Sequence, residues 1–532
     1  MTHDTSVDAA PRAGRLALST AFFSIATGLS RIAGLVREIV AASYFGVRGP
    51  MSAFTIAFQV PNLIRSLFAD AALQAAFVPV FTEQLEHRGR REAFRVASGL
   101  VFVISVSLGV LTALFVLLAP VIMPLFAPGF DDRLTDLTVD LAQLMFPIVL
   151  MLGLSGLVVG VLNSFEHFAV PAIAPLFWNI VIIATLVALT PAFEGDDRIY
   201  AYAIGILIGT LVQLLLPLPW LRRSGFRLTR EFNWRDERVL RVLKLMLPVT
   251  LGIGLINFNL SVNSIFATLI SEEAPAAIDK AFRIYMLPQG VFAVALATVL
   301  FPAFSRLATR GDMEGLRAVQ GSGTRQMLLL LVPAAALMLV LSEPITRVVY
   351  QRGEFDAAQT DLVAEALFFF ALSLPFAGVN LILIRTFFSL QLPWRPTQIA
   401  LANLGVNAGL DALLYKPMGI GGITLATAIV SLVTTVALAV TLRDQLGGVD
   451  MARTVQAGVR ILAAGALCAG VALAVREALS GVGGGLLEQT ALVAAASVAG
   501  LTVYGAVVLA TRVDEAHQIT ALVRGQVARL RR

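Results

Sequence analysis

"SRIAGLVREIVAASYFG", residues 30–46, closes an apolar run that begins near residue 18. A run of this length predicts a membrane-spanning helix, because roughly 20 apolar residues cross the hydrocarbon of a bilayer. The same run holds Arg31, Arg37 and Glu38. An ionised side chain near the bilayer centre costs roughly 2.5–3.5 kcal/mol on insertion scales. Charges retained at that cost indicate a functional site inside the membrane.

The composition of the 532-residue chain extends this prediction to its whole length. It is 57% hydrophobic and only 14% charged, whereas soluble domains carry about 25% charged residues. We therefore predict an all-α polytopic membrane protein with fourteen transmembrane helices. The single cysteine, Cys468, excludes a disulfide or zinc framework within one chain. The predicted spans are 18–46, 52–83, 96–118, 137–161, 168–190, 199–221, 240–270, 279–305, 325–346, 361–388, 396–415, 420–442, 455–476 and 487–511.

The basic residues predict how these spans are oriented. An even number of spans leaves both termini on one side, and positively charged loops stay in the cytoplasm. The loop from Arg222 to Lys244 alone carries eight basic residues, while the segments "EGDDR" (194–198) and "SEEAPAAIDK" (271–280) are acidic. We therefore expect cytoplasmic termini, and we read the net charge of +5 as a topology signal rather than a sign of nucleic-acid binding.

The two halves of the chain resemble each other at an offset of 223 to 225 residues. "AALQAAFVPVFTEQL" (71–85) aligns with "VALATVLFPAFSRLA" (294–308), which places Pro79 over Pro302. Six spans fit within the offset, so the halves are parallel repeats, which commonly enclose a transport path. We predict two six-helix lobes, 1–230 and 231–446, followed by two extra C-terminal helices and a basic tail within 447–532. A symmetric bundle without a path is the alternative.

The spans contain more cations than anions. Arg31, Arg37, Arg65 and Arg283 lie within them, while Glu38 and Asp70 are the nearby acids. On a helix Arg31 and Glu38 share nearly one face and Arg37 points about 120° away, so at least one arginine needs a partner elsewhere. A buried positive surplus fits an anionic ligand, and the arginine fork suits a pyrophosphate. Snorkelling or structural ion pairs are the alternative.

A second polar cluster lies on the spans near residues 396–442. Asn407 and Asp411 share a helix face at i,i+4, and Thr427 follows Ile423 on the next span. A carboxylate, an amide oxygen, a hydroxyl and a backbone carbonyl would suit a hard cation. The alternative is that Asp411 pairs with Lys416 at the outer end of its span.

Several of these stretches together resemble the MurJ (MviN) family of lipid II flippases, within the multidrug/oligosaccharidyl-lipid/polysaccharide exporter superfamily. They are residues 30–46, "AFTIAFQVPNLIRSLFADAALQAAFVPVF" (53–81), "APGF" (127–130), "VLNSFEHFAVPAIAPLFWN" (161–179) and "RGEFD" (352–356). The resemblance implies two lobes around a cationic cavity, and a groove along the last two helices for a polyprenyl tail. It also implies that the protein is not an enzyme.

By the same resemblance, specific residues would take part in transport. The four arginines, with Asn62, Glu38 and Asp70, would contact lipid II, and Asn407, Asp411, Ile423 and Thr427 match a sodium site of some members. No cofactor is implied; sodium or the membrane potential would drive transport. The expected location is the bacterial cytoplasmic membrane, and the expected state is a monomer among membrane lipids that contacts the cell-wall synthesis machinery. Ser52 departs from the family pattern, which usually has an aspartate there.

Other functions remain open at this point. One alternative is a flippase for another polyprenyl-linked glycan, and another is a cation-coupled drug exporter, although such exporters would not need four arginines within the spans. A membrane glycosyltransferase would require acidic metal-binding clusters beside a large loop, and no loop here exceeds about 30 residues. A scaffold that has lost transport is the last alternative.

Overall fold

The computed structural model describes residues 9–68, 71–165, 167, 169–229, 235–448, 450–479, 481 and 485–517. These residues form helices joined by short turns, and no strand occurs among them. Ten helical segments of the described chain are long and apolar enough to cross a membrane. The prediction of an all-α polytopic membrane protein is therefore confirmed, while the count of fourteen spans stays a prediction.

The chain forms two compact units, Met1–Ile265 and Phe266–Arg532. The division falls within one continuous helix, α10 (Glu237–Thr268), which runs from the first unit into the start of the second. The predicted lobe boundaries after residues 230 and 446 stay predictions.

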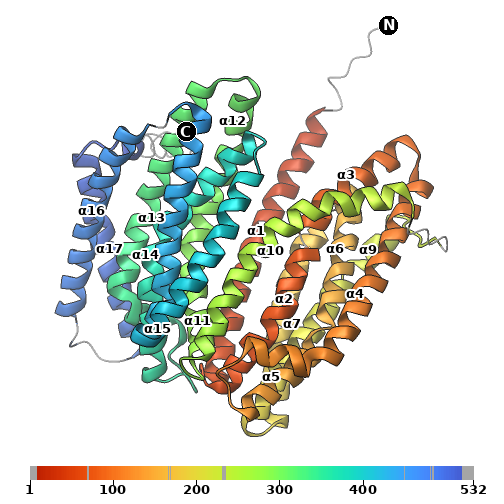
Figure 1. The fold of residues 1–532 in the computed structure, drawn as a ribbon, viewed down its shortest axis with the longest axis horizontal. Helices are drawn as coiled ribbons and strands as arrows, with labels where there is room; N and C mark the ends of the chain where they lie inside the picture. The colour runs from red at the N-terminus through yellow and green to blue at the C-terminus, as the bar shows by residue number, and fades with distance from the viewer. Residues whose placement is uncertain are drawn as a thin grey trace. The chain divides into compact units, whose positions relative to one another are not determined.

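The first unit is a bundle in which α7 packs on both α1 and α8, while α2 packs on α5 (Figure 1). Its helices before α10 are α1 (Ala9–Phe45), α2 (Gly49–Phe68), α3 (Ala71–His87), α4 (Arg90–Phe126), α5 (Asp132–Met145), α6 (Ile148–Ser164), α7 (Ala169–Leu189), α8 (Ile199–Leu215) and α9 (Leu218–Arg223), with short 3₁₀ turns at Thr190–Ala192 and Gly195–Arg198.

Proline breaks two predicted spans of this unit into pairs of helices. The predicted span 137–161 lies on α5 and α6, with Pro147 as the residue before α6. The predicted span 199–221 lies on α8 and α9, with Pro217 before α9. Proline has no N–H to donate and fixes its own φ, so it favours the start of a new helix over the continuation of an old one.

The second unit is built around α13 and α14, which pack on each other (Figure 1). The C-terminal helices α16 and α17 pack on α13, where the hydroxyl of Tyr504 donates a hydrogen bond to the carbonyl of Leu329 at 2.8 Å. The helices are α11 (Ala274–Pro288), α12 (Val294–Thr309), α13 (Met313–Tyr350), α14 (Ala357–Ser389), α15 (Trp394–Leu446), α16 (Met451–Ala478) and α17 (Leu486–Ala510), with a π-helical turn at Gln289–Ala293 between α11 and α12.

Helix α15 is a hairpin rather than one long rod. In a straight helix Asn403 and Thr434 would stand about 46 Å apart at 1.5 Å per residue. Instead the Asn403 side-chain amide donates a hydrogen bond to the Thr434 hydroxyl at 2.6 Å. The chain reverses at Gly419, whose φ of 54° is a left-handed conformation that glycine adopts without steric cost. The predicted spans 396–415 and 420–442 are thus separate, antiparallel helices.

Matching helix caps support the internal repeat. Asp131 accepts a hydrogen bond from the Leu134 amide at the start of α5, and Asp356 accepts one from the Gln359 amide at the start of α14. An aspartate in this position satisfies an amide that the helix itself leaves unbonded. The two caps lie 225 residues apart in the chain, within the offset that the sequence predicts.

Candidate functional site

The arginines of α1 lie in two different environments. Arg31 is exposed, whereas Arg37 is only 7% exposed and Glu38 only 3%. The Arg37 guanidinium forms an ion pair with the Glu38 carboxylate at 2.6 Å. Arg37 and Glu38 are consecutive residues on the helix, and their long side chains bend toward each other to form this pair.

Arg37 also contacts an aromatic ring of another helix. Its guanidinium carbon lies 4.6 Å from the centre of the Trp178 ring, which α7 supplies. This distance is within the range of a cation–π interaction. The sequence predicts that one arginine of α1 needs a distant partner, but the identity of that partner depends on how α1 packs on α7.

Three further residues predicted for this site lie on or next to α2. Asn62 is half-buried on α2. Arg65 also falls on α2, but its side chain and Asp70 are outside the described residues. Ser52, the departure from the family pattern, is fully buried.

In the second unit, Arg283 lies on α11 and has an acidic partner. Its Nε and Nη2 atoms donate hydrogen bonds to the two carboxylate oxygens of Asp279, at 3.1 and 3.3 Å. The Arg283 side chain remains 37% exposed. Asp279 belongs to the acidic segment 271–280 that the sequence assigns to an outer loop, so the positive surplus around the four arginines is smaller than predicted by this one carboxylate.

The polar residues of α15 lie on both arms of the hairpin. Asn407 and Asp411 are fully buried, and the Asn407 amide donates a hydrogen bond to Asp411 at 2.8 Å. On the other arm, the Thr427 hydroxyl donates to the Ile423 carbonyl at 3.3 Å. The Asn403–Thr434 hydrogen bond sets a register that places Thr427 within about one turn of the level of Asp411.

This donor set fits a small hard cation, because it offers carboxylate, amide, hydroxyl and backbone oxygens and no sulfur or imidazole. The amine of Lys416 lies over the Tyr415 ring, while Asp411 bonds to Asn407, so the structure does not show the alternative Asp411–Lys416 pair. Across the described part of the chain, no cluster of three or more His, Cys, Asp or Glu forms a metal site.

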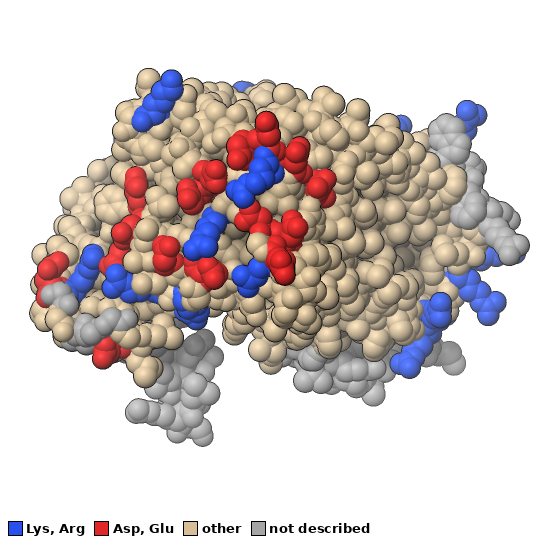
Figure 2. Space-filling view, turned by 90° about the horizontal axis from the view of Figure 1, so that it is seen from below, with Lys and Arg blue, Asp and Glu red and all other residues tan. Residues whose placement is uncertain are grey.

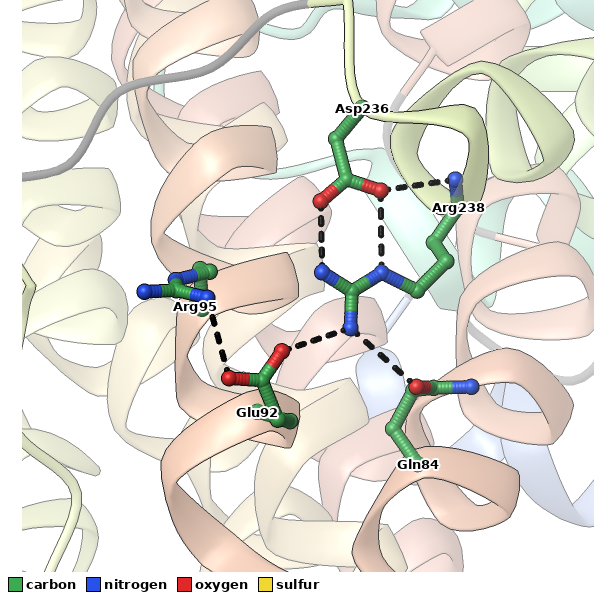
Figure 3. Close-up of polar contacts among 5 residues, drawn as sticks. All are labelled: Gln84, Glu92, Arg95, Asp236 and Arg238. Atoms are coloured by element: carbon green, nitrogen blue, oxygen red, sulfur yellow. Dashed lines mark hydrogen bonds and ion pairs between the residues drawn. The ribbon is translucent and has the colours of Figure 1, made fainter. Parts of the chain in front are cut away.

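A network of charged side chains joins the start of α10 to α3 and α4 (Figure 3). Arg238 donates to both carboxylate oxygens of Asp236 at 2.9 and 2.6 Å, to Glu92 at 2.9 Å and to Gln84 at 3.2 Å. Arg95 donates to the other oxygen of Glu92 at 3.0 Å. The Arg238 guanidinium holds the pKa of the Asp236 carboxyl below its usual range through these hydrogen bonds, against the opposite effect of burial.

Sequence reasoning did not find this network. It counts the basic residues of 222–244 only as a topology signal, although the spacing of Asp236 and Arg238 at the start of a helix is a local indication of a pair. The contacts of Arg238 with Glu92 and Gln84 depend on tertiary packing across about 150 residues and leave no local pattern.

Comparisons with known proteins identify the family. The family model described as "Lipid II flippase MurJ" matches residues 41–490. The chain belongs to the MurJ family. It is 36% identical over 422 residues to "Probable lipid II flippase MurJ" of Rhizobium tropici, covering 78% of each chain. It is 30% identical over 411 residues to "Lipid II flippase MurJ" of Burkholderia cenocepacia, covering 76% of this chain and 79% of that relative.

Solved structures show the same fold for this MurJ family member. The chain is similar to "Lipid II flippase MurJ, inward closed conformation", with a TM-score of 0.78 at 23% identity, covering 92% of this chain and 99% of that one. It also resembles an inward-facing multidrug transporter of the MATE family, with a TM-score of 0.66 at 15% identity over 79% of this chain and 94% of that one. At these identities the likenesses concern the fold alone.

Membership of the MurJ family decides between the broad alternatives. The chain is a multi-pass transporter rather than an enzyme, as predicted, because MurJ flippases are transporters. A membrane glycosyltransferase is thereby excluded.

Proposed function

We propose that the protein flips lipid II, the lipid-linked peptidoglycan precursor, from the inner to the outer leaflet of the bacterial cytoplasmic membrane. The observation that carries this proposal is the match of the lipid II flippase family over residues 41–490. The MATE transporters that share the fold include both inward-facing and outward-facing conformations. Such pairs of conformations support alternating access as the mode of transport.

Arginine side chains are proposed to hold the pyrophosphate of lipid II. Arg31 is exposed on α1 and Arg283 is 37% exposed on α11, so both guanidinium groups are accessible to a ligand. The guanidinium fork forms two parallel hydrogen bonds with phosphate oxygens. Arg37, Arg65, Asn62, Glu38 and Asp70 complete the proposed substrate-binding set. The carboxylates would hold the arginines in place, since Asp279 does so for Arg283.

The proposed route of coupling uses a cation or the membrane potential. Asn407, Asp411, Ile423 and Thr427 would supply oxygen ligands to sodium, which would stabilise whichever conformation brings them together. A ligand shifts a conformational equilibrium only by binding one state better than the other. The buried Asn407–Asp411 pair and the register of the α15 hairpin support such a site.

Depletion of the protein in its host is the experiment that tests the function. We expect lipid II to accumulate on the cytoplasmic leaflet, where a reagent that modifies externally exposed lipid II cannot reach it. Accumulation of a different polyprenyl-linked glycan would show that the protein handles that lipid, and unchanged lipid pools would show that it has no flippase role.

Complementation of the depleted strain tests the arginines. Arg31→Ala and Arg283→Ala are each expected to abolish growth while the protein remains in the membrane. Arg453→Ala is the matched control, because Arg453 is 80% exposed and lies 3.9 Å from its nearest carboxylate, that of Asp450. Normal growth of an Arg31→Ala, Arg283→Ala double variant would contradict the pyrophosphate role.

A further inference from the structure

Trp178 is the second-to-last residue of the family-like stretch 161–179, and the proposed function gives it no role. It lies on α7, half-buried, with its ring against the buried guanidinium of Arg37. The ring is itself fixed in place, because its indole N–H donates a hydrogen bond to the Thr210 hydroxyl of α8 at 3.1 Å. Thr210 is only 1% exposed, and its own hydroxyl donates to the Ile206 carbonyl at 2.7 Å.

The packing of α8 against α7 leaves little freedom for this ring. A Cβ atom on Gly209 would lie 3.0 Å from the Trp178 carbonyl oxygen and 3.2 Å from its ring carbon Cδ1. These separations are tighter than ordinary van der Waals contact, so the absence of a side chain at Gly209 lets α8 approach the indole. Trp178 is therefore held from one side by α8 and faces Arg37 of α1 on another.

We propose that Trp178 is the positioning residue for Arg37, fixing the direction of its guanidinium at the packing seam of α1 and α7. The ring face at 4.6 Å and the Glu38 carboxylate at 2.6 Å both contact the guanidinium. This inference rests on the proposed function, since it makes Trp178 act on pyrophosphate binding through Arg37. Tryptophan is the best cation–π partner among the aromatic residues, and the interaction strengthens when the cation is desolvated.

A ring that only fills space and a ring that directs a charge respond differently to substitution. Leucine keeps apolar bulk without a π face, whereas phenylalanine keeps a ring face and loses the indole N–H. If Trp178 positions Arg37, Trp178→Leu weakens lipid II binding about tenfold, the size of a partly desolvated cation–π contact. Trp178→Phe should lower the affinity for lipid II less, by roughly two- to threefold.

A double-mutant cycle separates positioning from general packing. In an Arg37→Met background the Trp178→Leu change should cause no further loss of lipid II affinity, because the charge on which Trp178 acts is gone. Binding is measured by native mass spectrometry of the purified full-length protein titrated with lipid II, and thermal midpoints are recorded for the same variants.

The chain offers a matched control in a second arginine–tryptophan pair. The Arg223 guanidinium lies 5.8 Å from the centre of the Trp220 ring on α9, and Trp220 is 36% exposed. Trp220→Leu should leave lipid II affinity unchanged. If Trp178→Leu does not fold, Thr210→Val keeps the ring but removes the hydroxyl that fixes the indole and that also bonds to the Ile206 carbonyl, and it should still weaken lipid II binding.

Two results would overturn the proposal: equal affinities for Trp178→Leu and Trp178→Phe, or a further loss of affinity when Trp178→Leu is added to Arg37→Met. A failure of the proposed function looks different, because the wild-type protein itself would then not bind lipid II. In that case the thermal midpoints of the same cycle still report whether Trp178 and Arg37 are coupled.

Discussion

At the scale of the residue, the sequence shows which charges are unusual but not what surrounds them. Arg37 and Glu38 stand out because they interrupt an apolar run, and both prove to be buried. The contact of Arg37 with Trp178 could not be predicted, since Trp178 is 141 residues further along the chain. Helical periodicity gives the direction of a side chain on its own helix, and tertiary packing gives its partner.

The Asp236 carboxyl gives a pH-dependent prediction at this scale. Its pKa is lowered in the folded protein, so it contributes stability that is fully present above its unfolded pKa of about 3.9. That contribution is lost as the pH falls through the lower, folded pKa. Asp236→Asn should therefore reduce the free energy of unfolding at pH 7 by about 1.5–3 kcal/mol, the value of hydrogen bonds to a charged group.

The measurement is the thermal midpoint of the purified protein at pH 7 and at progressively lower pH. The gap between wild type and Asp236→Asn should be largest at pH 7 and narrow below about pH 4. Glu83→Gln is the control, because Glu83 forms only an exposed ion pair with Arg241, and such pairs contribute about 0–1 kcal/mol. A gap that grows on acidification would contradict the role of Arg238 in lowering this pKa.

At the scale of the element, apolar runs predict where helices lie better than they predict where helices break. The sequence separates the spans 396–415 and 420–442, and the structure confirms the reversal between them at Gly419. Hydropathy does not show the break at Pro147 or the π-helical turn after Pro288, although a proline within a span can free carbonyls and bend the helix, as expected for Pro288. Apolar composition continues through both places, so hydropathy alone shows one uninterrupted run.

The hairpin of α15 leads to a prediction about glycine. A Cβ atom on Gly422 would clash with the Leu414 carbonyl, which belongs to the opposite arm. Gly422→Ala should therefore destabilise the protein by about 1–3 kcal/mol, as overpacking of a close contact does. A Cβ atom on Gly405 of the same helix would have no neighbour within 4 Å. Gly405→Ala should therefore leave the stability unchanged or raise it by up to about 1 kcal/mol, because alanine has the higher helix propensity.

The stability of both variants is measured by their thermal midpoints and by the fraction of monodisperse protein after extraction from the membrane. Equal stability of Gly422→Ala and Gly405→Ala would show that the two arms of α15 do not approach each other as closely as described.

At the scale of the whole molecule, the fold class follows from features that extend over the sequence. Runs of about 20 apolar residues and an offset repeat are present throughout the chain, so a few misplaced boundaries leave the prediction intact. The candidate site is less predictable. The sequence supplies its arginines, and the Asp279–Arg283 pair follows from i,i+4 spacing on one helix. The contacts of Trp178 and of Arg238 with Glu92 arise only when the helices pack.

The orientation of the chain in the membrane is a prediction at this scale. Basic segments remain in the cytoplasm, so reporter fusions after residues 90, 232 and 315 should report a cytoplasmic location. Fusions after 196 and 275 should report the periplasm. Figure 2 shows charged side chains of both signs gathered on part of the drawn face, beside areas of other residue types. A reversed pattern of reporters would overturn the positive-inside assignment.

The driving force of transport gives the last prediction. Outward movement of a pyrophosphate across a negative-inside membrane is favoured by about 2.3 kcal/mol per charge for each 100 mV, so the return of the empty carrier is the step that needs help. A cation at Asp411 would assist that return by stabilising one conformation.

Asp411→Asn removes the charge but keeps a side-chain oxygen that can accept the hydrogen bond from Asn407, so the fold should persist. We expect slower turnover with lipid II affinity within about twofold of wild type, whereas Arg31→Ala lowers the affinity itself. Asp444→Asn, at an exposed position of the same helix, is the control and should change neither quantity. If Asp411→Asn weakens lipid II binding as much as Arg31→Ala, then Asp411 belongs to the substrate site and coupling lies elsewhere.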